Sequence, residues 1–330
     1  MRNSNSLMRN WFGVGLPTSR PSEETLRLAV DVESLGFGQV WIGDHYHSRN
    51  PFLLLATIAT HTHQIKLCTG ITNPFQISPA VLASTIATLD ELTNGRVLLG
   101  LGVGDETTLK QIGVYPANPV SAMSQCIAVI RDLWEGKSVS GFVGPFQWEE
   151  ACLKIRPPHR LPLYIGAQNI GMVRLALEMG DGLVMNASSP LDYRWINKIE
   201  INKRSTSFQT IAYLIVEINK APSTLLRQLL AQIVAGASNR MLERHEIPLE
   251  DADQIIRFVR QGRYQAAGQA ITKRMIDSFA VVGSLGMVEM RIEELRKENV
   301  NGFIFGGPLA EDRRKGLRNL AEIAQSFRAG

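Results

Sequence analysis

The residues best suited to chemistry come at the end of one apolar run, in the segment 96–106, whose sequence is RVLLGLGVGDE. The run 97–101 is apolar throughout, which is typical of a strand buried on both faces in a parallel sheet. Its alternating glycines, Gly100 to Gly104, allow a tight turn or a close approach to a ligand. Asp105 follows, at the carboxyl end of the strand, where α/β proteins place their chemistry. A carboxylate at this position can exchange a proton with a substrate.

This glycine pattern is not a dinucleotide fingerprint. The third glycine of GLGVGD comes one residue too early for G-x-G-x-x-G. At least two strand-like segments precede it, whereas the fingerprint usually occupies the first βα turn. The first such turn of this chain, LPTSRP at 16–21, contains no glycine. The function of this glycine pattern can be inferred only together with the residues at the other strand ends.

The other predicted strand ends carry small residues, amides, hydroxyls and a few ionisable groups. They read GLP at 15–17, DHY at 44–46, GITNP at 70–74, GAQ at 166–168, NAS at 186–188 and GGP at 306–308. The six histidines show no metal-ligand spacing, so we predict no metal site, and no G-x-S-x-G elbow indicates a serine hydrolase. Strand ends that carry these side chains can bind a flat polar heterocycle. The backbone amides of 166–169, which precede a helix, can bind a phosphate. The same glycines can equally serve only to form βα turns.

Alternating strands and helices must position these residues. The predicted strands are 11–16, 39–43, 65–70, 97–101, 162–166, 181–186, 210–218 and 302–306, with helical patterns between them. The segment 136–149 indicates an inserted hairpin or loop, and the charged, helical stretch 225–275 indicates an insertion after the seventh strand. Eight such strands predict an α/β fold, a (β/α)8 TIM barrel, in a single domain 1–330 with an insertion at about 221–280. The alternative, an open doubly wound sheet, would carry a nucleotide fingerprint in its first turn.

Composition agrees with an ordinary globular protein. The chain has 330 residues, 45% of them hydrophobic, and a net charge of +4 that is spread along its length. This charge permits an anionic ligand, but no nucleic-acid motif accompanies it. Cys68, Cys126 and Cys152 match no metal or redox spacing and are expected to be buried, reduced thiols. With no signal peptide or membrane span in the sequence, we expect a soluble, cytoplasmic protein.

Eight motifs, taken in order, carry a more specific resemblance. They are WIGDHY at 41–46, TGITNPF at 69–75, ATLDELTNGR at 87–96, GLGVGD at 100–105, YIGAQ at 164–168, DGLVMNAS at 181–188, LERHEIP at 242–248 and SFAVVG at 278–283. With them the chain resembles the 5,10-methylenetetrahydromethanopterin reductases, a branch of the bacterial-luciferase-like superfamily. The resemblance runs from the first strand to the final helix.

The resemblance implies coenzyme F420 lying across the strand ends and direct hydride transfer from C5 of the reduced deazaflavin to the one-carbon unit of a pterin. It implies a non-proline cis peptide at Gly70–Ile71 against the ring, and usually a homo-oligomer, here a homodimer or homotetramer. The implied cofactor neighbours are Asp44, His45, Gly70, Ile71, Thr72, Asn73, Gly166, Ala167, Gln168, Asn186, Ala187 and Ser188.

Two carboxyl-end residues match family positions beside the substrate. Asp105 and Gln168 are therefore predicted as catalytic, with Asp105 supplying the carboxylate chemistry. Asp105 can also act as the N-cap of a helix that begins at Glu106, and the two roles are compatible.

The chain departs from the family pattern at two places. The first-strand pattern F-G-I-E becomes FGVG at 12–15, so Gly15 replaces an acid, and G-S-P-I-G-P-D becomes GGPLAED at 306–312. Both changes favour an altered substrate over an altered cofactor. Two alternatives remain, an FMN-dependent luciferase-like monooxygenase and a relative that binds the coenzyme without reducing a pterin.

Overall fold

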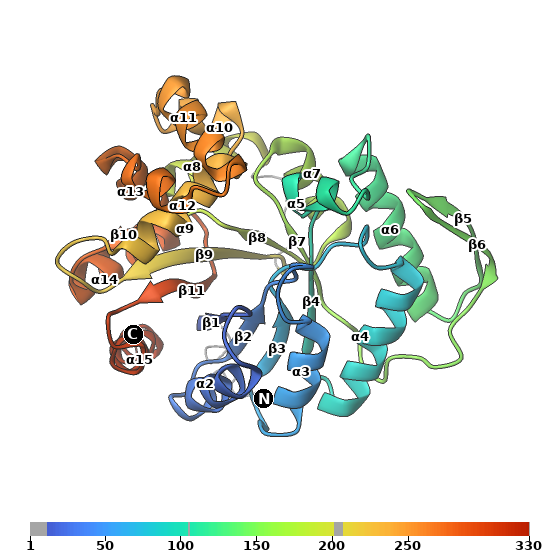
Figure 1. Cartoon of the computed structure of the whole chain (residues 1–330). Helices are drawn as coiled ribbons and strands as arrows, with labels where there is room; N and C mark the ends of the chain where they lie inside the picture. The colour runs from blue at the N-terminus through green and yellow to red at the C-terminus, as the bar shows by residue number, and fades with distance from the viewer. Residues whose placement is uncertain (1–11, 105, 201–206, 330) are drawn as a thin grey trace. The chain divides into compact units, whose positions relative to one another are not determined.

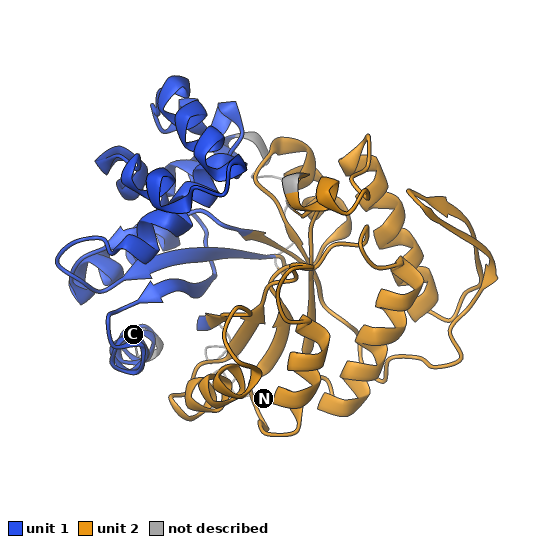
Figure 2. Ribbon diagram, in the orientation of Figure 1, with its two compact units in different colours: residues 1–13, 185–205, 209–330 blue, residues 14–184, 206–208 orange. Residues whose placement is uncertain are grey.

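The computed structural model describes residues 12–104, 106–200 and 207–329. It divides into two compact units (Figure 2). Unit 1 comprises residues 1–13, 185–205 and 209–330, and unit 2 comprises residues 14–184 and 206–208. The single-domain interpretation stays a prediction.

Unit 2 is built on parallel strands that are almost entirely buried. In sheet order they are β1 (Phe12–Leu16), β2 (Gln39–Ile42), β3 (Lys66–Thr69), β4 (Val97–Leu101), β7 (Leu163–Gly166) and β8 (Gly182–Met185). The first two residues of β1 and the last residue of β8 are assigned to unit 1. The pairs from β2 to β8 are parallel, and Trp41 lies opposite Cys68. Every residue of β2 and β4 is buried, as the apolar runs predict. Trp11, expected to begin the first strand, lies outside the described residues.

Helices follow these strands along the chain and lie outside them (Figure 1). They are α2 (Ser22–Ser34), α3 (Pro51–Ala59), α4 (Pro79–Thr93), α5 (Glu106–Gln111), α6 (Pro119–Trp134) and α7 (Ile170–Met179). Proline begins α3, α4 and α6, where its missing N–H has no helical partner to lose. Asn50 and Asn118 cap α3 and α6 through their side chains. The helices α3, α4 and α6 therefore begin at the prolines that the sequence predicts as helix starts.

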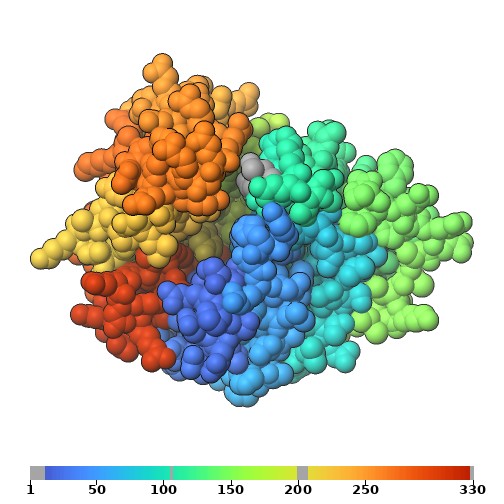
Figure 3. Space-filling view, in the orientation of Figure 1, coloured from blue at the N-terminus to red at the C-terminus, as the bar shows by residue number. Residues whose placement is uncertain are grey.

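An antiparallel hairpin interrupts the alternation in unit 2. Its strands are β5 (Val139–Val143) and β6 (Phe146–Ala151), so the insertion predicted at 136–149 is a hairpin. The hairpin lies on the outer surface of the unit (Figure 3), and Phe142 is 76% exposed.

Unit 1 contains a second set of parallel strands. Their order is β10 (Val281–Val282), β9 (Gln209–Glu217) and β11 (Gly302–Leu309). The flanking helices are α8 (Pro190–Glu200), α14 (Leu285–Lys297) and α15 (Arg313–Ala329). The sequence analysis did not single out α14, although its buried residues Val288, Ile292 and Leu295 follow helical spacing.

The predicted insertion after β9 is helical and has its own core. It contains α9 (Thr224–Gly236), α10 (Asn239–Arg244), α11 (Leu249–Arg260), α12 (Tyr264–Gln269) and α13 (Lys273–Phe279). Leu230, Val234, Ile255 and Met275 pack together in this core. Serine and threonine caps start several of these helices, among them Ser223 and Thr272, so the stretch is divided into short helices rather than one long one.

The cysteines only partly match their expectation. Cys68 and Cys126 are buried, and burial raises the pKa of the Cys126 thiol to about 12. The expectation of a buried thiol is wrong for Cys152, which is exposed because it follows the surface hairpin.

No helix in the described ranges is both long and apolar enough to cross a membrane.

Candidate active site

The segment after β3 is fixed by backbone hydrogen bonds on both sides. The Gly70–Ile71 peptide is cis, as the resemblance implies. Gly70 N donates to Ile42 O at 2.7 Å, and Asp44 N donates to Ile71 O at 3.2 Å. On the other side, Thr72 N donates to Gly100 O at 3.0 Å. The segment is therefore held between the ends of β2 and β4.

Glycines in and just after β4, and at the end of β7, make room for this segment. A Cβ on Gly102 would lie 2.0 Å from Ile71 Cδ1, and a Cβ on Gly166 would lie 2.6 Å from the same atom. A Cβ on Gly100 would lie 2.1 Å from the carbonyl oxygen of Thr69. These three glycines therefore make room for Thr69 of β3 and for the Ile71 side chain.

A short hydrogen bond joins two of the predicted cofactor neighbours. The Thr72 hydroxyl donates to Asp44 Oδ2 at 2.6 Å. Thr72 is fully buried and Asp44 is half-buried, so the bond orients a carboxylate at the edge of the site. Asn73 closes the following turn, because its side-chain oxygen accepts from Phe75 N at 3.1 Å and Gln76 N at 3.0 Å. His45 is exposed.

The end of β7 is held in a similar way. Ala167 N donates to Val184 O at 3.1 Å, and Gln168 is half-buried beside it. The Asn169 side chain caps α7 by accepting from Met172 N at 3.1 Å. Unit 2 thus brings Asp44, the segment 70–73 and the segment 166–168 to the carboxyl ends of neighbouring strands.

The segment Asn186–Ser188 belongs to unit 1, where its polar groups are largely engaged. The Ser188 hydroxyl donates to Phe279 O at 3.1 Å and accepts from Ile215 N at 3.3 Å. Ala187 O accepts from the Tyr193 hydroxyl at 3.0 Å. The Ser188 hydroxyl therefore fixes the conformation of this loop. Of the residues 186–188, Asn186 has a half-buried side chain and the other two are buried.

The structure describes one of the two predicted catalytic residues. Asp105 lies outside the described residues. Gln168 lies at the end of β7, as predicted. Gly15 is buried within β1 and supplies no carboxylate.

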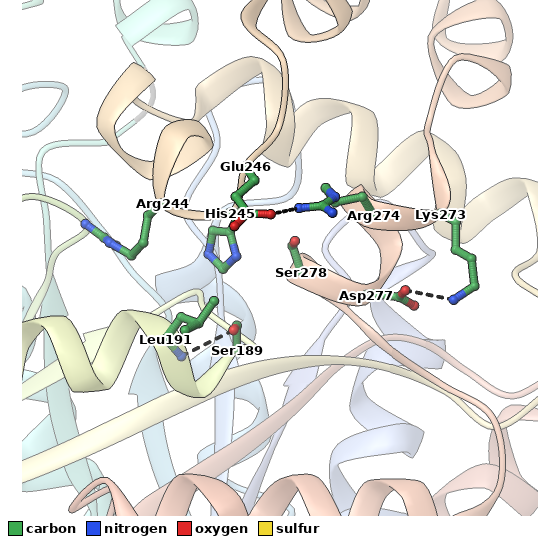
Figure 4. A pocket seen from close by; sticks show the side chains of 9 residues that line it. All are labelled: Ser189, Leu191, Arg244, His245, Glu246, Lys273, Arg274, Asp277 and Ser278. Atoms are coloured by element: carbon green, nitrogen blue, oxygen red, sulfur yellow. Dashed lines mark hydrogen bonds and ion pairs between the residues drawn. The ribbon is translucent and has the colours of Figure 1, made fainter.

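Unit 1 also contains a polar cavity that the sequence did not predict (Figure 4). Its volume is about 490 Å³, and Arg244 and His245 form part of its wall. Both side chains bind Asp192, which is fully buried, with Arg244 Nη1 at 2.5 Å and His245 Nε2 at 3.0 Å from its carboxylate oxygens. The motif LERHEIP contains Arg244 and His245, but nothing in the sequence links them to an aspartate more than fifty residues earlier.

Comparisons with known proteins agree with this architecture. The Luciferase-like monooxygenase family model matches residues 6–301. The 5,10-methylenetetrahydromethanopterin reductase of Archaeoglobus fulgidus is 36% identical over 88% of this chain and 91% of its own. That of Methanolobus tindarius is 31% identical over 94% of this chain and 98% of its own. A solved structure, the coenzyme F420 dependent tetrahydromethanopterin reductase of Methanopyrus kandleri, aligns with a TM-score of 0.86 at 30% identity, covering 96% and 99% of the two chains.

These similarities settle the fold and the family. The predicted (β/α)8 TIM barrel with a helical insertion after the seventh barrel strand is confirmed. Relatives more than 30% identical match nearly the whole chain. The chain therefore belongs to the luciferase-like monooxygenase family and, within it, to the 5,10-methylenetetrahydromethanopterin reductases.

Proposed function

We propose that this chain is an F420-dependent oxidoreductase that transfers a hydride between C5 of the reduced deazaflavin and the one-carbon unit of a pterin or a related acceptor. The observation that carries the proposal is the similarity, at 36% identity over most of both chains, to a methylenetetrahydromethanopterin reductase. Other relatives named as F420-dependent dehydrogenases match about half of the chain and support the same coenzyme.

The described residues of unit 2 fit a flat heterocycle. Ile71 presents an apolar side chain whose position depends on Gly102 and Gly166. The Thr72–Asp44 hydrogen bond fixes a polar group at the edge of the same region. Apolar packing with a few fixed polar groups is the usual composition of a cofactor site.

Twelve residues at the predicted strand ends are proposed to contact the coenzyme. They are Asp44, His45, Gly70, Ile71, Thr72, Asn73, Gly166, Ala167, Gln168, Asn186, Ala187 and Ser188. The bound deazaflavin supplies the hydride. The protein's part is to position the ring and the acceptor face to face and to exclude water.

Proton transfer is assigned to the residues at the ends of β4 and β7. A methylene-pterin must open to an iminium cation before it accepts a hydride, and this step needs a proton. We propose that Asp105 supplies the proton and that Gln168 orients the acceptor. Gly15 makes Asp105 the principal remaining carboxylate, because the strand-one acid of the family pattern is absent.

One observation favours a second candidate function. The glycine at position 15 removes an acid from the substrate side, which supports a coenzyme-binding relative with an altered acceptor. An FMN-dependent monooxygenase is the other alternative, since the Luciferase-like monooxygenase model matches the chain. The absorbance of the purified protein distinguishes a bound deazaflavin from a bound flavin.

The chain is further proposed to act as a homodimer or homotetramer in the cytoplasm, on small molecules and without nucleic-acid or membrane partners. Exposed apolar side chains on α3 and α4 support self-association, since Leu53 is 72%, Val81 54% and Leu92 60% exposed. Light scattering on the purified protein measures the assembly directly.

Turnover tests the function. Under anaerobic conditions, oxidation of reduced F420 is followed with methylene-pterins and, in parallel, with other small hydride acceptors. Oxidation that depends on the pterin supports the proposal. Oxidation with another acceptor alone would identify the altered substrate, and none with any acceptor would contradict the activity.

A further inference from the structure

Helix α5 of unit 2 is tied to the segment after β3, which carries proposed coenzyme contacts. The Leu109 side chain of α5 is buried, and its Cδ1 atom lies 3.1 Å from the position that a Cβ on Gly104 would take. The Asn73 Nδ2 atom lies 3.4 Å from the same position. Leu109 and Asn73 therefore pack against one glycine, which connects α5 to the segment 70–73.

The other end of α5 is held by a hydrogen bond to the loop after β2. The Tyr46 hydroxyl donates to Gln111 Oε1 at 2.7 Å, and Gln111 is the last residue of α5. Both side chains are exposed. Tyr46 directly follows Asp44 and His45, so this bond joins the helix to a second group of proposed coenzyme contacts.

These contacts close a ring around the two groups. The inner part of the ring joins the strand ends directly, because Asp44 N donates to Ile71 O at 3.2 Å and the Thr72 hydroxyl donates to Asp44 Oδ2 at 2.6 Å. The outer part is α5, which joins the same two segments through Tyr46 and Asn73. Without the Tyr46 bond, α5 would remain attached only on its Leu109 side.

The Tyr46 ring also supports a pair of stacked histidines. It meets the His47 ring edge to face, with the centroids 5.2 Å apart. The His47 ring in turn stacks on the His45 ring, with the centroids 5.6 Å apart and the planes 11° from parallel. A tyrosine that is fixed at its hydroxyl therefore limits the movement of His45 as well.

We propose that Tyr46 is a positioning residue for coenzyme binding and that it acts through its hydrogen bond to Gln111. The bond keeps Asp44, His45 and Asn73 in one arrangement before the coenzyme arrives. Preorganised contacts bind a ligand more tightly, because less conformational freedom is lost on binding. The inference rests on the proposed function, since these three residues are coenzyme contacts only in an F420-dependent enzyme.

A double-mutant cycle tests whether Tyr46 acts through Gln111. Tyr46→Phe removes the donor, Gln111→Leu removes the acceptor, and the full-length protein is titrated with oxidised F420. Losing one hydrogen bond shifts the balance between held and released α5 about fivefold. Since a single exposed bond leaves both states populated, each variant should weaken coenzyme binding about threefold. The double variant should also weaken it about threefold, because both changes remove the same bond, whereas independent effects would multiply to about ninefold.

Tyr264→Phe is the matched control, because Tyr264 is 46% exposed and Tyr46 is 47% exposed. Tyr264 begins α12 in unit 1, and this variant should bind F420 as the wild type does. All variants should melt within about 2 °C of the wild type, since the lost bond is exposed. Wild-type affinity in Tyr46→Phe or in Gln111→Leu would overturn the proposal, as would a loss of about ninefold in the double variant or a much lower melting temperature.

Turnover separates this inference from the proposed function. In Tyr46→Phe the KM for reduced F420 should rise about threefold, whereas kcat and the KM for the pterin should stay as in the wild type. Coenzyme binding that follows the cycle without any turnover would contradict the proposed reaction and leave the role of Tyr46 standing. Normal turnover with an unchanged KM for F420 in Tyr46→Phe would do the reverse. A wild-type protein that does not bind F420 would contradict both.

Discussion

At the scale of single residues, the best-defined polar feature of unit 2 is the hydrogen bond from Thr72 to Asp44. The donor is fully buried and the acceptor is half-buried. Such a bond is shielded from competing water, so it fixes the direction of the carboxylate. Asp44 is a proposed coenzyme contact, and its orientation should therefore control coenzyme affinity.

Replacing Thr72 by valine tests this directly. Thr72→Val keeps the side-chain shape but removes the donor, and we expect the KM for reduced coenzyme to rise about tenfold. Thr85→Val is the control, because the Thr85 hydroxyl only bonds to the carbonyl of Val81 on the exposed side of α4. Equal KM values in the two variants would contradict the assignment of Asp44.

Gly15 is the second decisive single residue. A positioned general acid contributes about a hundredfold or more to rate. Gly15→Glu should therefore raise the rate of pterin reduction at least about tenfold if the missing carboxylate separates this chain from its family. Gly15→Gln has nearly the same volume and no acid, so it should give no gain. A gain in both variants, or in neither, would point to a pocket altered elsewhere.

At the scale of elements, the distance between β3 and β4 depends on glycine. A Cβ on Gly100 would meet the backbone oxygen of Thr69, whereas a Cβ on Gly102 would meet only the end of the Ile71 side chain. Backbone cannot move aside without separating the strands, but a side-chain methyl can rotate. The two glycines should therefore respond differently to the same substitution.

We expect Gly100→Ala to lower the free energy of unfolding by about 3 kcal/mol, as overpacked cores do. Gly102→Ala should cost less than about 1 kcal/mol but displace Ile71 and weaken coenzyme binding. Gly286→Ala is the control, because its Cβ would meet nothing closer than 3.9 Å within α14. Urea denaturation and coenzyme titration distinguish these outcomes, and equal stability losses for Gly100→Ala and Gly102→Ala would contradict them.

Helix α2 is connected to the start of β3 by a single carboxylate. Glu33 accepts hydrogen bonds from the backbone N–H groups of His63, Gln64 and Ile65. Partial burial raises the pKa of Glu33, but these three donors and the nearby Arg96 outweigh burial and hold it below its ordinary value. The ionised side chain is therefore the form that stabilises this junction.

A lowered pKa in the folded state gives stability that is present above the unfolded pKa and lost as pH falls through the folded value. Glu33→Gln should lower the free energy of unfolding by about 1 kcal/mol at neutral pH. The difference from wild type should shrink below pH ~4, near the ordinary pKa of glutamate. Denaturation across this pH range checks the sign, and a difference that grows on acidification would contradict the role of Glu33.

At the scale of the whole molecule, the barrel and its insertion were predictable because strand and helix patterns are local. The apolar run 97–101 matches β4 residue for residue, and the proline at 119 marks the start of α6. The contacts of Asp192 with Arg244 and His245 were not predictable, because they join distant segments of the chain. The role of Gly102 was hidden for the same reason, since its neighbour Ile71 lies on another strand end.

In the proposed reaction this molecule moves a hydride from reduced F420 to a pterin. The most direct test supplies reduced coenzyme in which both C5 hydrogens are deuterium, under anaerobic conditions, together with a methylene-pterin. We expect one deuterium in the methyl group of the product for each coenzyme oxidised. Coenzyme oxidation without deuterium in the product, or turnover only with reduced FMN and oxygen, would contradict it.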